Sequence, residues 1–253
     1  MKLTLEGKTA LVTGANGGLG SHFAQTLAKA GARVVVAARR VDSLRSVCDA
    51  IATAGGRAEP IALDVTNHEN VARAFDMGAA ALGPITVVVN NAGIAITKPL
   101  LEHTEEDWQQ VIEVNLNGAW RVAQAAARHM VKNEQGGSIV NIASILGLRV
   151  SAQVPSYAAS KAALIHLTKA MALELARYRI RVNALAPGYV ETGINKEFFA
   201  SEPGQALIKR VPQRRIGQPE ELDGALLLLA SDAGSYTTGA VLAVDGGHLV
   251  NTL

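Results

Sequence analysis

Runs of apolar and largely β-branched residues alternate along the whole chain with alanine-rich stretches that suit helices. The apolar runs are continuous rather than alternating, which is typical of strands buried on both faces of a sheet. This strand–helix alternation predicts βαβ units and an α/β fold built on a doubly wound parallel sheet. The expected strands are residues 9–14, 33–38, 58–63, 85–90, 138–143, 180–186 and 240–245, and the helix-compatible stretches are 18–30, 42–54, 67–82, 104–133, 156–178 and 219–231.

A chain of 253 residues can form one large domain or two ordinary ones. Hydrophobic residues make up 49% of it and charged residues 18%, which is enough for a sizeable core and far from a disordered composition. No linker, internal repeat or low-complexity stretch divides the sequence. We therefore expect a single domain over residues 1–253.

Charge and cysteine content exclude several classes of protein. The net charge of +2, with no basic tract beyond pairs such as Arg39–Arg40, argues against nucleic acid or an acidic membrane as a partner. No apolar run reaches the ~18 residues that a spanning helix needs, and Glu6 and Lys8 interrupt any signal core. Cys48 is the only cysteine, and the six histidines show no ligand spacing. We expect a soluble, cytoplasmic protein without a disulfide or a metal site.

The first expected strand runs straight into a glycine-rich turn, TGANGGLG at 13–20, and a helix follows. In such an arrangement the backbone amides and the helix N-terminus can receive a pyrophosphate. The glycines follow G-x-x-x-G-x-G rather than the usual dinucleotide pattern, and an ordinary βα loop would also contain glycine. The position after the first strand favours a nucleotide, and the residues expected to contact it are Gly14, Asn16, Gly18, Leu19 and Gly20.

The second expected strand ends near Ala38, where an NAD enzyme usually carries an acid that binds the ribose hydroxyls. Here the acid is absent, and Arg39 and Arg40 follow. A guanidinium at this place would hold a 2′-phosphate, so we predict that NADP(H) is preferred over NAD(H). The alternative is a solvated surface pair.

Polar and small residues mark the ends of the next two expected strands. Asp64 and Val65 end the third strand, where Asp64 is well placed to meet an adenine edge. Asn91, Ala92 and Gly93 follow the fourth strand, and their small size lets the backbone come close to a ligand, although Asn and Gly are also plain turn formers. Both groups lie at the carboxyl edge of the sheet, where open α/β folds bind ligands.

Asn115 and Gly118 fall inside the otherwise good helical stretch 104–133 and work against helix propensity. Local misfits of this kind tend to be functional or strained sites. Asn115 is therefore a candidate site residue.

Ser144, Tyr157 and Lys161 make chemical sense together. Ser144 lies where an apolar strand ends, and Tyr157 and Lys161 are four residues apart, so they share one face of a helix. A phenol has a pKa of about 10, and an ammonium one turn away favours its ionised form, so Lys161 is expected to lower the pKa of Tyr157. The tyrosine would then move a proton to or from an oxygen that the serine hydrogen-bonds, which is the proton half of a ketone–alcohol interconversion. Taken alone, Y-x-x-x-K is also common by chance.

Together these motifs resemble the classical short-chain dehydrogenase/reductase family across essentially the whole chain. The resemblance implies a Rossmann-like sheet of about seven strands in the order 3-2-1-4-5-6-7, with a cofactor half near 1–135 and a catalytic and substrate part near 136–253. It also implies an NAD(P)-dependent oxidoreductase acting on CH–OH groups, assembled as a homotetramer or homodimer. The matching segments are T-G-x-x-x-G-x-G at 13–20, D-V at 64–65, N-N-A-G at 90–93, Asn115, Ser144, Y-x-x-x-K at 157–161 and Pro187-Gly188.

The same resemblance implies a role for each member of an Asn–Ser–Tyr–Lys tetrad. Tyr157 would be the acid–base and Ser144 would orient the substrate oxygen. Lys161 would lower the pKa of the tyrosine and bind the nicotinamide ribose, and Asn115 would help to hold a water of the proton relay. The residues implied to contact the nicotinamide end of the cofactor are Tyr157, Lys161, Pro187, Gly188, Val190 and Thr192.

One departure from the family pattern concerns the cofactor. Members that use NADP often carry a basic residue where Gly17 stands in this chain. The predicted NADP preference therefore depends on Arg39 and Arg40 alone.

The segment 194–208 is expected to belong to a lid over residues 192–210. Its apolar side chains would form one wall of a substrate site, and the loop after Ser144 would form the other. Such a site would favour a fairly apolar ketone or secondary alcohol, although the same residues could equally pack the lid onto the body. The residues expected to line the site are Ile145, Leu146, Val154, Tyr189, Phe198 and Phe199, with Leu148, Leu207 and Ile208 beside them.

The chain also looks similar to 3-oxoacyl-carrier-protein reductases and to sugar-acid dehydrogenases. Carrier-protein reductases typically place arginines near the ends of the two long helices, where this chain has Gln135 and Tyr178. The basic residues close by are Arg128, Lys132, Arg177 and Arg179, so this argument weakens the assignment without removing it. An NADP-binding regulator would be expected to lose the tyrosine or lysine first, yet all four tetrad positions are filled. We therefore expect an NADPH-dependent carbonyl reductase or alcohol dehydrogenase acting on a small molecule.

Overall fold

The computed structural model describes residues 3–192 and 196–251. Over these residues seven parallel strands form one sheet in the order β3-β2-β1-β4-β5-β6-β7, which confirms the predicted fold. Each strand coincides with one of the predicted apolar runs. Their bounds are β1 (Thr9–Thr13), β2 (Arg33–Ala38), β3 (Arg57–Ala62), β4 (Ile85–Asn90), β5 (Gly137–Ile142), β6 (Ile180–Pro187) and β7 (Val241–Val244).

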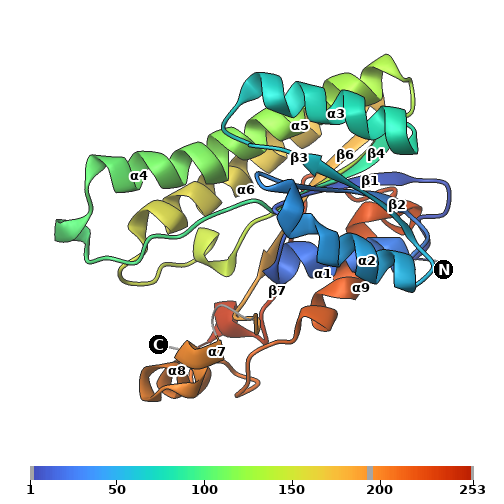
Figure 1. Cartoon of the computed structure of the whole chain (residues 1–253). Coiled ribbons are helices and arrows are strands. Elements are labelled where there is room, and N and C mark those ends of the chain that lie inside the picture. The colour runs from blue at the N-terminus through green and yellow to red at the C-terminus, as the bar shows by residue number, and fades with distance from the viewer. Residues whose placement is uncertain (1–2, 193–195, 252–253) are drawn as a thin grey trace.

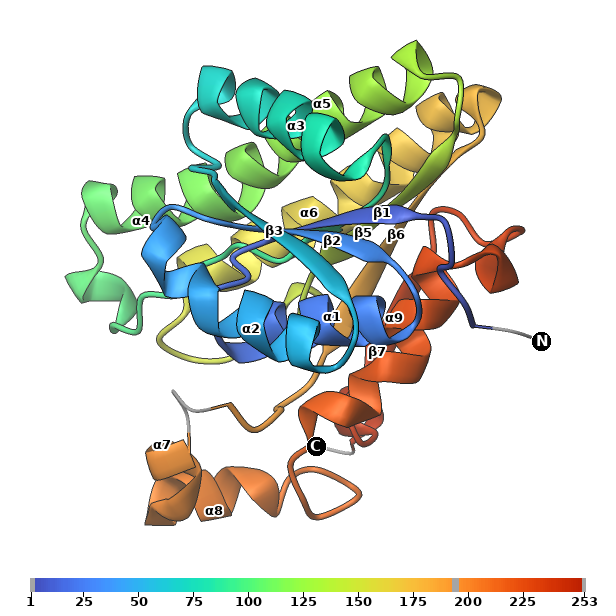
Figure 2. The same ribbon diagram turned by 45° about the vertical axis from the view of Figure 1, so that its right-hand side comes forward.

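Helices cover both faces of the sheet (Figure 1 and Figure 2). One face is covered by α1 (Gly18–Lys29), α2 (Arg45–Thr53) and α9 (Asp223–Ala230), and the other by α3 (His68–Leu82), α5 (Ala119–Lys132) and α6 (Pro155–Leu175). The shorter helices are α4 (Glu105–Ile112), α7 (Lys196–Ala200) and α8 (Glu202–Ile208). None of the helices within the described ranges has the length and apolar character needed to cross a membrane.

Successive residues of the central strands pack into separate cores on the two faces of the sheet. In β1, Ala10 and Val12 join the cluster that contains residues of α1 and α9, whereas Leu11 joins the cluster that contains residues of α3 and α5. In β2, Val34 and Val35 divide in the same way. Because these residues are buried on both faces of the sheet, most positions of these strands are apolar, which explains the continuous hydrophobic runs of the sequence.

The strand order reverses at β1, which has β2 on one side and β4 on the other. The crevice beyond the carboxyl ends of such strands is the usual ligand site of an open α/β sheet. Here the loop after β4 is fastened to the end of β1, because the Asn91 backbone N–H donates to Thr13 Oγ1 and the Asn91 side-chain amide donates to the Thr13 carbonyl, each at 3.0 Å. The two loops that face this crevice are thereby held together.

The stretch 104–133, expected as one helix, is interrupted in the middle. Helix α4 ends at Ile112, residues Glu113–Gly118 form a π-helical turn, and α5 begins at Ala119. Turns of this type are frequent at functional sites. Close packing requires glycine at position 118, since a Cβ there would lie 2.6 Å from Cγ2 of Val65. The residues that contradict helix propensity thus lie where the regular helix breaks.

Helices α7 and α8 form most of the segment predicted as a lid, residues 192–210. In both views they stand apart from the helices that cover the sheet (Figure 1 and Figure 2). Residues 193–195 of the predicted lid, Ile194 among them, lie outside the described residues.

Candidate active site

The four predicted tetrad residues come together at the carboxyl ends of β4 and β5. Ser144 follows β5, and its hydroxyl accepts a hydrogen bond from the Leu146 backbone at 3.1 Å. Tyr157 and Lys161 lie one turn apart on α6, with the Lys161 Nζ 5.6 Å from the centroid of the tyrosine ring. A Cβ at Gly93 would lie 3.3 Å from Asn115 Oδ1 and 3.5 Å from Lys161 Nζ, so the loop after β4 borders both groups.

Asn115 connects three segments of the site through a fully buried amide. Its Oδ1 accepts from the Ile94 backbone at 2.8 Å, and its Nδ2 donates to the Ile94 carbonyl at 2.9 Å and to Ser160 Oγ at 3.1 Å. Ser160 in turn donates to the backbone carbonyl of Tyr157 at 2.7 Å. The amide therefore fixes the loop after β4 against the N-terminal part of α6, where Tyr157 lies.

Lys161 is buried, with only 4% of its surface exposed, and its ammonium donates to the Ile142 carbonyl at 2.8 Å. Burial lowers the pKa of this lysine to about 8. Keeping the ammonium charged inside the fold therefore costs free energy.

The structure corrects the prediction that Lys161 lowers the pKa of Tyr157. Although the tyrosine side chain is only half-buried as a whole, burial around its hydroxyl raises the pKa, the hydrogen bond with Ser144 acts in the opposite direction, and the neighbouring Tyr189 raises it further. Lys161 is not among the groups that set this shift, and its ammonium is bonded to the Ile142 carbonyl. The hydroxyl of Tyr157 is thus held in its protonated form.

The glycine-rich turn has the geometry of a phosphate cradle. Gly14 and Gly18 adopt positive φ angles of 64° and 51°, and a Cβ at Gly20 would lie 2.1 Å from the Gly14 carbonyl oxygen. Helix α1 begins here without a side-chain cap, so its first backbone amides remain available for an anion. Asn16 is exposed at the tip of the turn, and Leu19 packs against the core. These residues fit a dinucleotide pyrophosphate.

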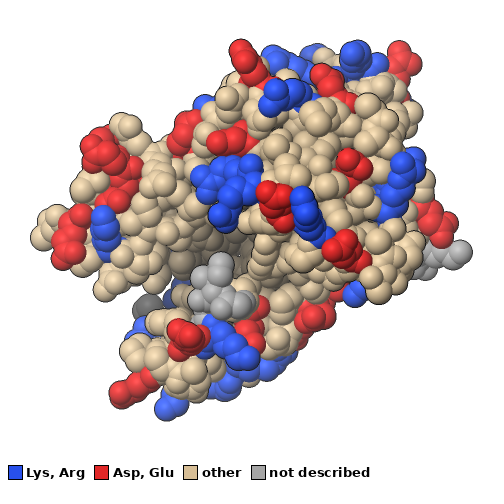
Figure 3. All heavy atoms as spheres, in the orientation of Figure 1, with Lys and Arg blue, Asp and Glu red and all other residues tan. Residues whose placement is uncertain are grey.

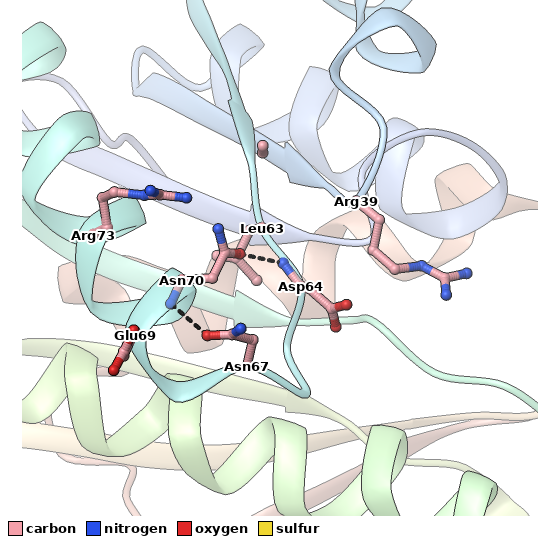
Figure 4. A pocket seen from close by; sticks show the side chains of 8 residues that line it. Arg39, Leu63, Asp64, Asn67, Glu69, Asn70 and Arg73 are labelled. Atoms are coloured by element: carbon pink, nitrogen blue, oxygen red, sulfur yellow. Dashed lines mark hydrogen bonds between the residues drawn. The ribbon is translucent and has the colours of Figure 1, made fainter.

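A cavity of about 540 Å³ lies beside the carboxyl ends of β2 and β3 (Figure 4). Its lining is mostly polar, and Figure 4 shows Arg39 and Arg73 on opposite sides of Asp64. Arg39 is exposed, whereas Val65, next to Asp64, is buried and does not line it. The lining residues are Arg39, Ala62, Leu63, Asp64, Asn67, Glu69, Asn70 and Arg73, so Arg40 is not among them.

The segment after β6 meets the glycine turn from the other side. A Cβ at Gly18 would lie 4.0 Å from Thr192 Cγ2. Val190 pairs with Gly217 in a β-bridge, and Gly188 lies so close to Asp245 that a Cβ would stand 2.6 Å from the Asp245 Cα. Segment 187–192 is therefore held on both sides, opposite the turn that is predicted to bind the pyrophosphate.

The predicted substrate residues divide into buried and exposed groups. Ile145 and Phe199 are almost completely buried, at 2% and 5% exposure, so they pack the loop and the lid rather than present a free wall. Phe198 and Leu148 are about half exposed, at 49% and 47%. Tyr189 is half-buried and packs edge-on against Phe199. The remaining residues, Leu146, Val154, Leu207 and Ile208, are half-buried. Figure 3 shows the molecule hollowed between the body and the α7–α8 part.

Comparison with known proteins agrees with this geometry. The family described as enoyl-(acyl carrier protein) reductase matches residues 14–248. The chain is 38% identical over 248 residues to the 3-oxoacyl-[acyl-carrier-protein] reductase of Thermotoga maritima, covering 98% of this chain and 100% of the relative. A solved short-chain type dehydrogenase/reductase from Mycobacterium marinum shares 44% identity with a TM-score of 0.93, over 98% of this chain and 97% of that one. A gluconate 5-dehydrogenase from Burkholderia cenocepacia, solved with NADP and tartrate, shares 38% identity with a TM-score of 0.94, over 99% and 98%.

The chain belongs to the short-chain dehydrogenase/reductase family. It is therefore an oxidoreductase that acts on CH–OH groups, as the motifs predict.

Two residues of this short-chain dehydrogenase/reductase were missed by sequence reasoning. Ser160 joins Asn115 to α6, and its only signal in the sequence is a small polar residue next to Lys161. Arg73 lines the cavity beside Arg39, but its approach depends on how α3 packs against β3. No cluster of three or more potential metal ligands occurs among residues 3–192 and 196–251.

Replacing Gly20 with Ala should distort the cofactor turn, because the added Cβ would overlap the Gly14 backbone carbonyl. We expect a loss of about 1–3 kcal/mol in stability and a weaker affinity for NADPH. Gly17→Ala is the matched control, because its backbone is extended, with φ 169°, and a Cβ there meets nothing within 4 Å. Thermal unfolding and titration of NADPH fluorescence measure both effects, and equal behaviour of the two variants would refute the packing argument.

Replacing Lys161 with Met should change how stability depends on pH. Burial lowers the lysine pKa from 10.5 to about 8, so between these values the unfolded chain binds a proton that the folded protein has released. The wild type should therefore gain about 2–3 kcal/mol relative to Lys161→Met as the pH rises through this interval. Urea unfolding at a series of pH values measures the difference, with Lys132→Met as the exposed control. Parallel curves for the wild type and Lys161→Met would contradict this prediction.

Proposed function

We propose that this protein is an NADP(H)-dependent oxidoreductase that interconverts a ketone and a secondary alcohol, with Tyr157 as the acid–base. The observation that carries the proposal is the meeting of Tyr157 and Ser144 at the end of β5, close enough for Ser144 to act on the pKa of the tyrosine, with the buried Lys161 beside the tyrosine ring. Both hydroxyls can hydrogen-bond the same substrate oxygen. Only residues Asn91–Gly93 of the loop after β4 lie between these hydroxyls and the glycine turn.

The raised pKa of Tyr157 suits a proton donor. In the reduction of a ketone, the tyrosine hydroxyl gives its proton to the oxygen on which negative charge develops, and Ser144 stabilises that oxygen with a hydrogen bond. The nicotinamide cofactor supplies the hydride in this direction and receives it in the other. Lys161 supplies a buried positive charge next to the phenol ring, and Asn115 borders Gly93 together with Lys161, where it is proposed to help to hold a water of the proton relay.

The proposed preference for NADP(H) follows from Arg39, which lines the cavity at the end of β2 where an acid would serve NAD. Arg40 lies beyond the cavity lining and is the weaker candidate. The NADP bound to the Burkholderia relative supports the proposal. The remaining cofactor contacts proposed are those of the glycine turn, of Asp64 and Val65, of Asn91–Gly93 and of segment 187–192.

The substrate proposed is a small carbonyl compound. Two alternative substrates follow from the relatives: a 3-oxoacyl group from the Thermotoga protein and a sugar acid from the Burkholderia protein. A regulator without chemistry is disfavoured, because Asn115, Ser144, Tyr157 and Lys161 are all present and assembled.

The proposed assembly is a homotetramer or homodimer in the cytoplasm. Large apolar side chains on the helices above the sheet support self-association: Trp108, Trp120 and Val131 on α4 and α5, and Leu173 on α6, are exposed.

Replacing Tyr157 with Phe tests the chemistry, because it removes the proton donor and leaves the ring. Turnover should fall by about 10²–10⁴-fold, with NADPH affinity retained. The assay follows NADPH absorbance with an acetoacetyl thioester, a β-keto ester, an aryl ketone and 5-ketogluconate. Tyr178→Phe, on an exposed tyrosine stacked with Arg177, is the control. A Tyr157→Phe enzyme that turns over these ketones at the wild-type rate would exclude the mechanism.

Replacing Arg39 with Ala tests the cofactor preference. Loss of a charged hydrogen bond to a 2′-phosphate should weaken NADPH binding by about 1.5–3 kcal/mol and leave NADH binding unchanged. Arg128→Ala, which removes an exposed charge from α5, is the control. An equal change in the affinities for NADPH and NADH, or no change in either, would show that Arg39 does not bind the 2′-phosphate.

A further inference from the structure

A group of basic and hydrogen-bonding side chains surrounds Tyr189, next to the proposed proton donor. The Tyr189 ring lies 5.3 Å from the ring of His248, measured between centroids, and Ser151 is near enough to act on the pKa of the Tyr189 hydroxyl. Tyr189 also lies close enough to Tyr157 to raise the pKa of that residue. Whatever binds at this group is therefore beside the oxygen that Tyr157 would protonate.

Two guanidinium groups approach Tyr189 from separate elements. Arg149 belongs to the loop between β5 and α6, and Arg210 follows α8. Burial raises the pKa of Tyr189, and the charges of both arginines act in the opposite direction. The same two charges, together with burial, lower the pKa of His248. Both arginines thus act on the same pair of rings.

Neither arginine has a carboxylate partner within residues 3–192 and 196–251. One of the five N–H groups of Arg149 donates a hydrogen bond to the backbone carbonyl of His248. The carboxylate that acts on the pKa of His248 is that of Asp245. Its two oxygens accept hydrogen bonds from the backbone N–H groups of Gly247 and Leu249 at 2.9 and 2.7 Å. The cations therefore keep free donors while the local acid is already bonded.

His248 adds an independent sign of a missing partner. The residue is buried, with 5% exposure, and its Nδ1 has no hydrogen-bond partner among the residues that the structure describes. A buried polar atom without a partner is costly unless a ligand or water satisfies it.

The end of the lid and the turn that follows it are also basic. Residues 196–215 contain five Lys or Arg and two Glu, and one of these cations, Arg215, is paired with Glu221. In Figure 3, Lys and Arg side chains gather over the α7–α8 part of the surface, beneath the hollow. A field of this sign favours the entry of an anion.

We propose that the substrate carries a carboxylate, which Arg149 binds with Arg210 beside it while the carbonyl or hydroxyl carbon lies at Tyr157. The substrate class is then a keto acid or hydroxy acid, because a guanidinium offers two parallel N–H groups that match a carboxylate. This inference depends on the proposed function, since it assigns one end of the substrate of the same site. It replaces the apolar wall expected from the sequence with a charged contact.

Binding to enzyme loaded with the cofactor form that cannot react tests the charge separately from turnover. Calorimetry would compare D-gluconate with D-sorbitol on the NADPH-loaded enzyme, because these two share a carbon chain and differ in the terminal carboxylate. It would compare 4-oxopentanoate with its amide on the NADP+-loaded enzyme. We expect each anion to bind about tenfold or more tightly than its neutral partner. Arg149→Gln should abolish this preference, Arg149→Lys should keep part of it, and Arg210→Gln should reduce it.

Arg128→Gln is the matched control, because it removes one exposed arginine from α5 and should leave both affinities unchanged. Thermal unfolding and NADPH affinity confirm that the Arg149 variants are folded. Equal binding of anion and neutral partner in both pairs, or an Arg149→Gln effect no larger than that of Arg128→Gln, would overturn the inference. Reduction of a neutral ketone in that case would leave the proposed function intact. Anion-selective binding that depends on Arg149, in an enzyme that reduces none of the ketones, would support the anion site and reject the proposed chemistry.

Discussion

The buried amide of Asn115 holds the two halves of the site in register. It accepts a hydrogen bond from the Ile94 N–H and donates one to the Ile94 carbonyl, and it also donates to Ser160 on α6. Asn115 lies within the π-helical turn at Glu113–Gly118, where the regular helix is interrupted. Gly118 lets that turn approach Val65 closely enough to pack. The loop that borders the cofactor cleft and the helix that carries Tyr157 are both fixed through this one side chain.

The electrostatics of the site follow from the same close packing. Tyr157 and Lys161 are placed on α6 against the sheet, and burial moves their pKa values in opposite directions, upward for the phenol and downward for the ammonium. Each group is thereby biased toward its neutral form. A neutral phenol is a proton donor, and a lysine with a pKa of about 8 carries its charge near neutrality at an energetic cost. The fold tolerates that cost beside the tyrosine that is proposed as the acid–base.

The sequence was sufficient wherever a property is local. Continuous apolar runs identified every strand because each central strand is buried on both faces, and the spacing of Tyr157 and Lys161 defined a shared helix face. It failed where partners are distant in the chain. The pKa direction of Tyr157 depends on its buried surroundings, and the burial of Ile145 and Phe199 depends on how the loop and lid pack. The meeting of Arg149 with His248, ninety-nine positions apart, leaves no local pattern to read.

The position of Arg39 has a consequence for how such a protein can change over generations. The arginine follows β2, whereas Ser144 follows β5, and three strand spacings separate them, about 14 Å. Arg39 is exposed and does not contact the amide network around Asn115. Substitutions at sites this far apart, without shared partners, have nearly additive effects. Because Arg39 is the residue proposed to bind the 2′-phosphate, we expect that a substitution at this exposed position can change the cofactor preference and leave the catalytic geometry intact.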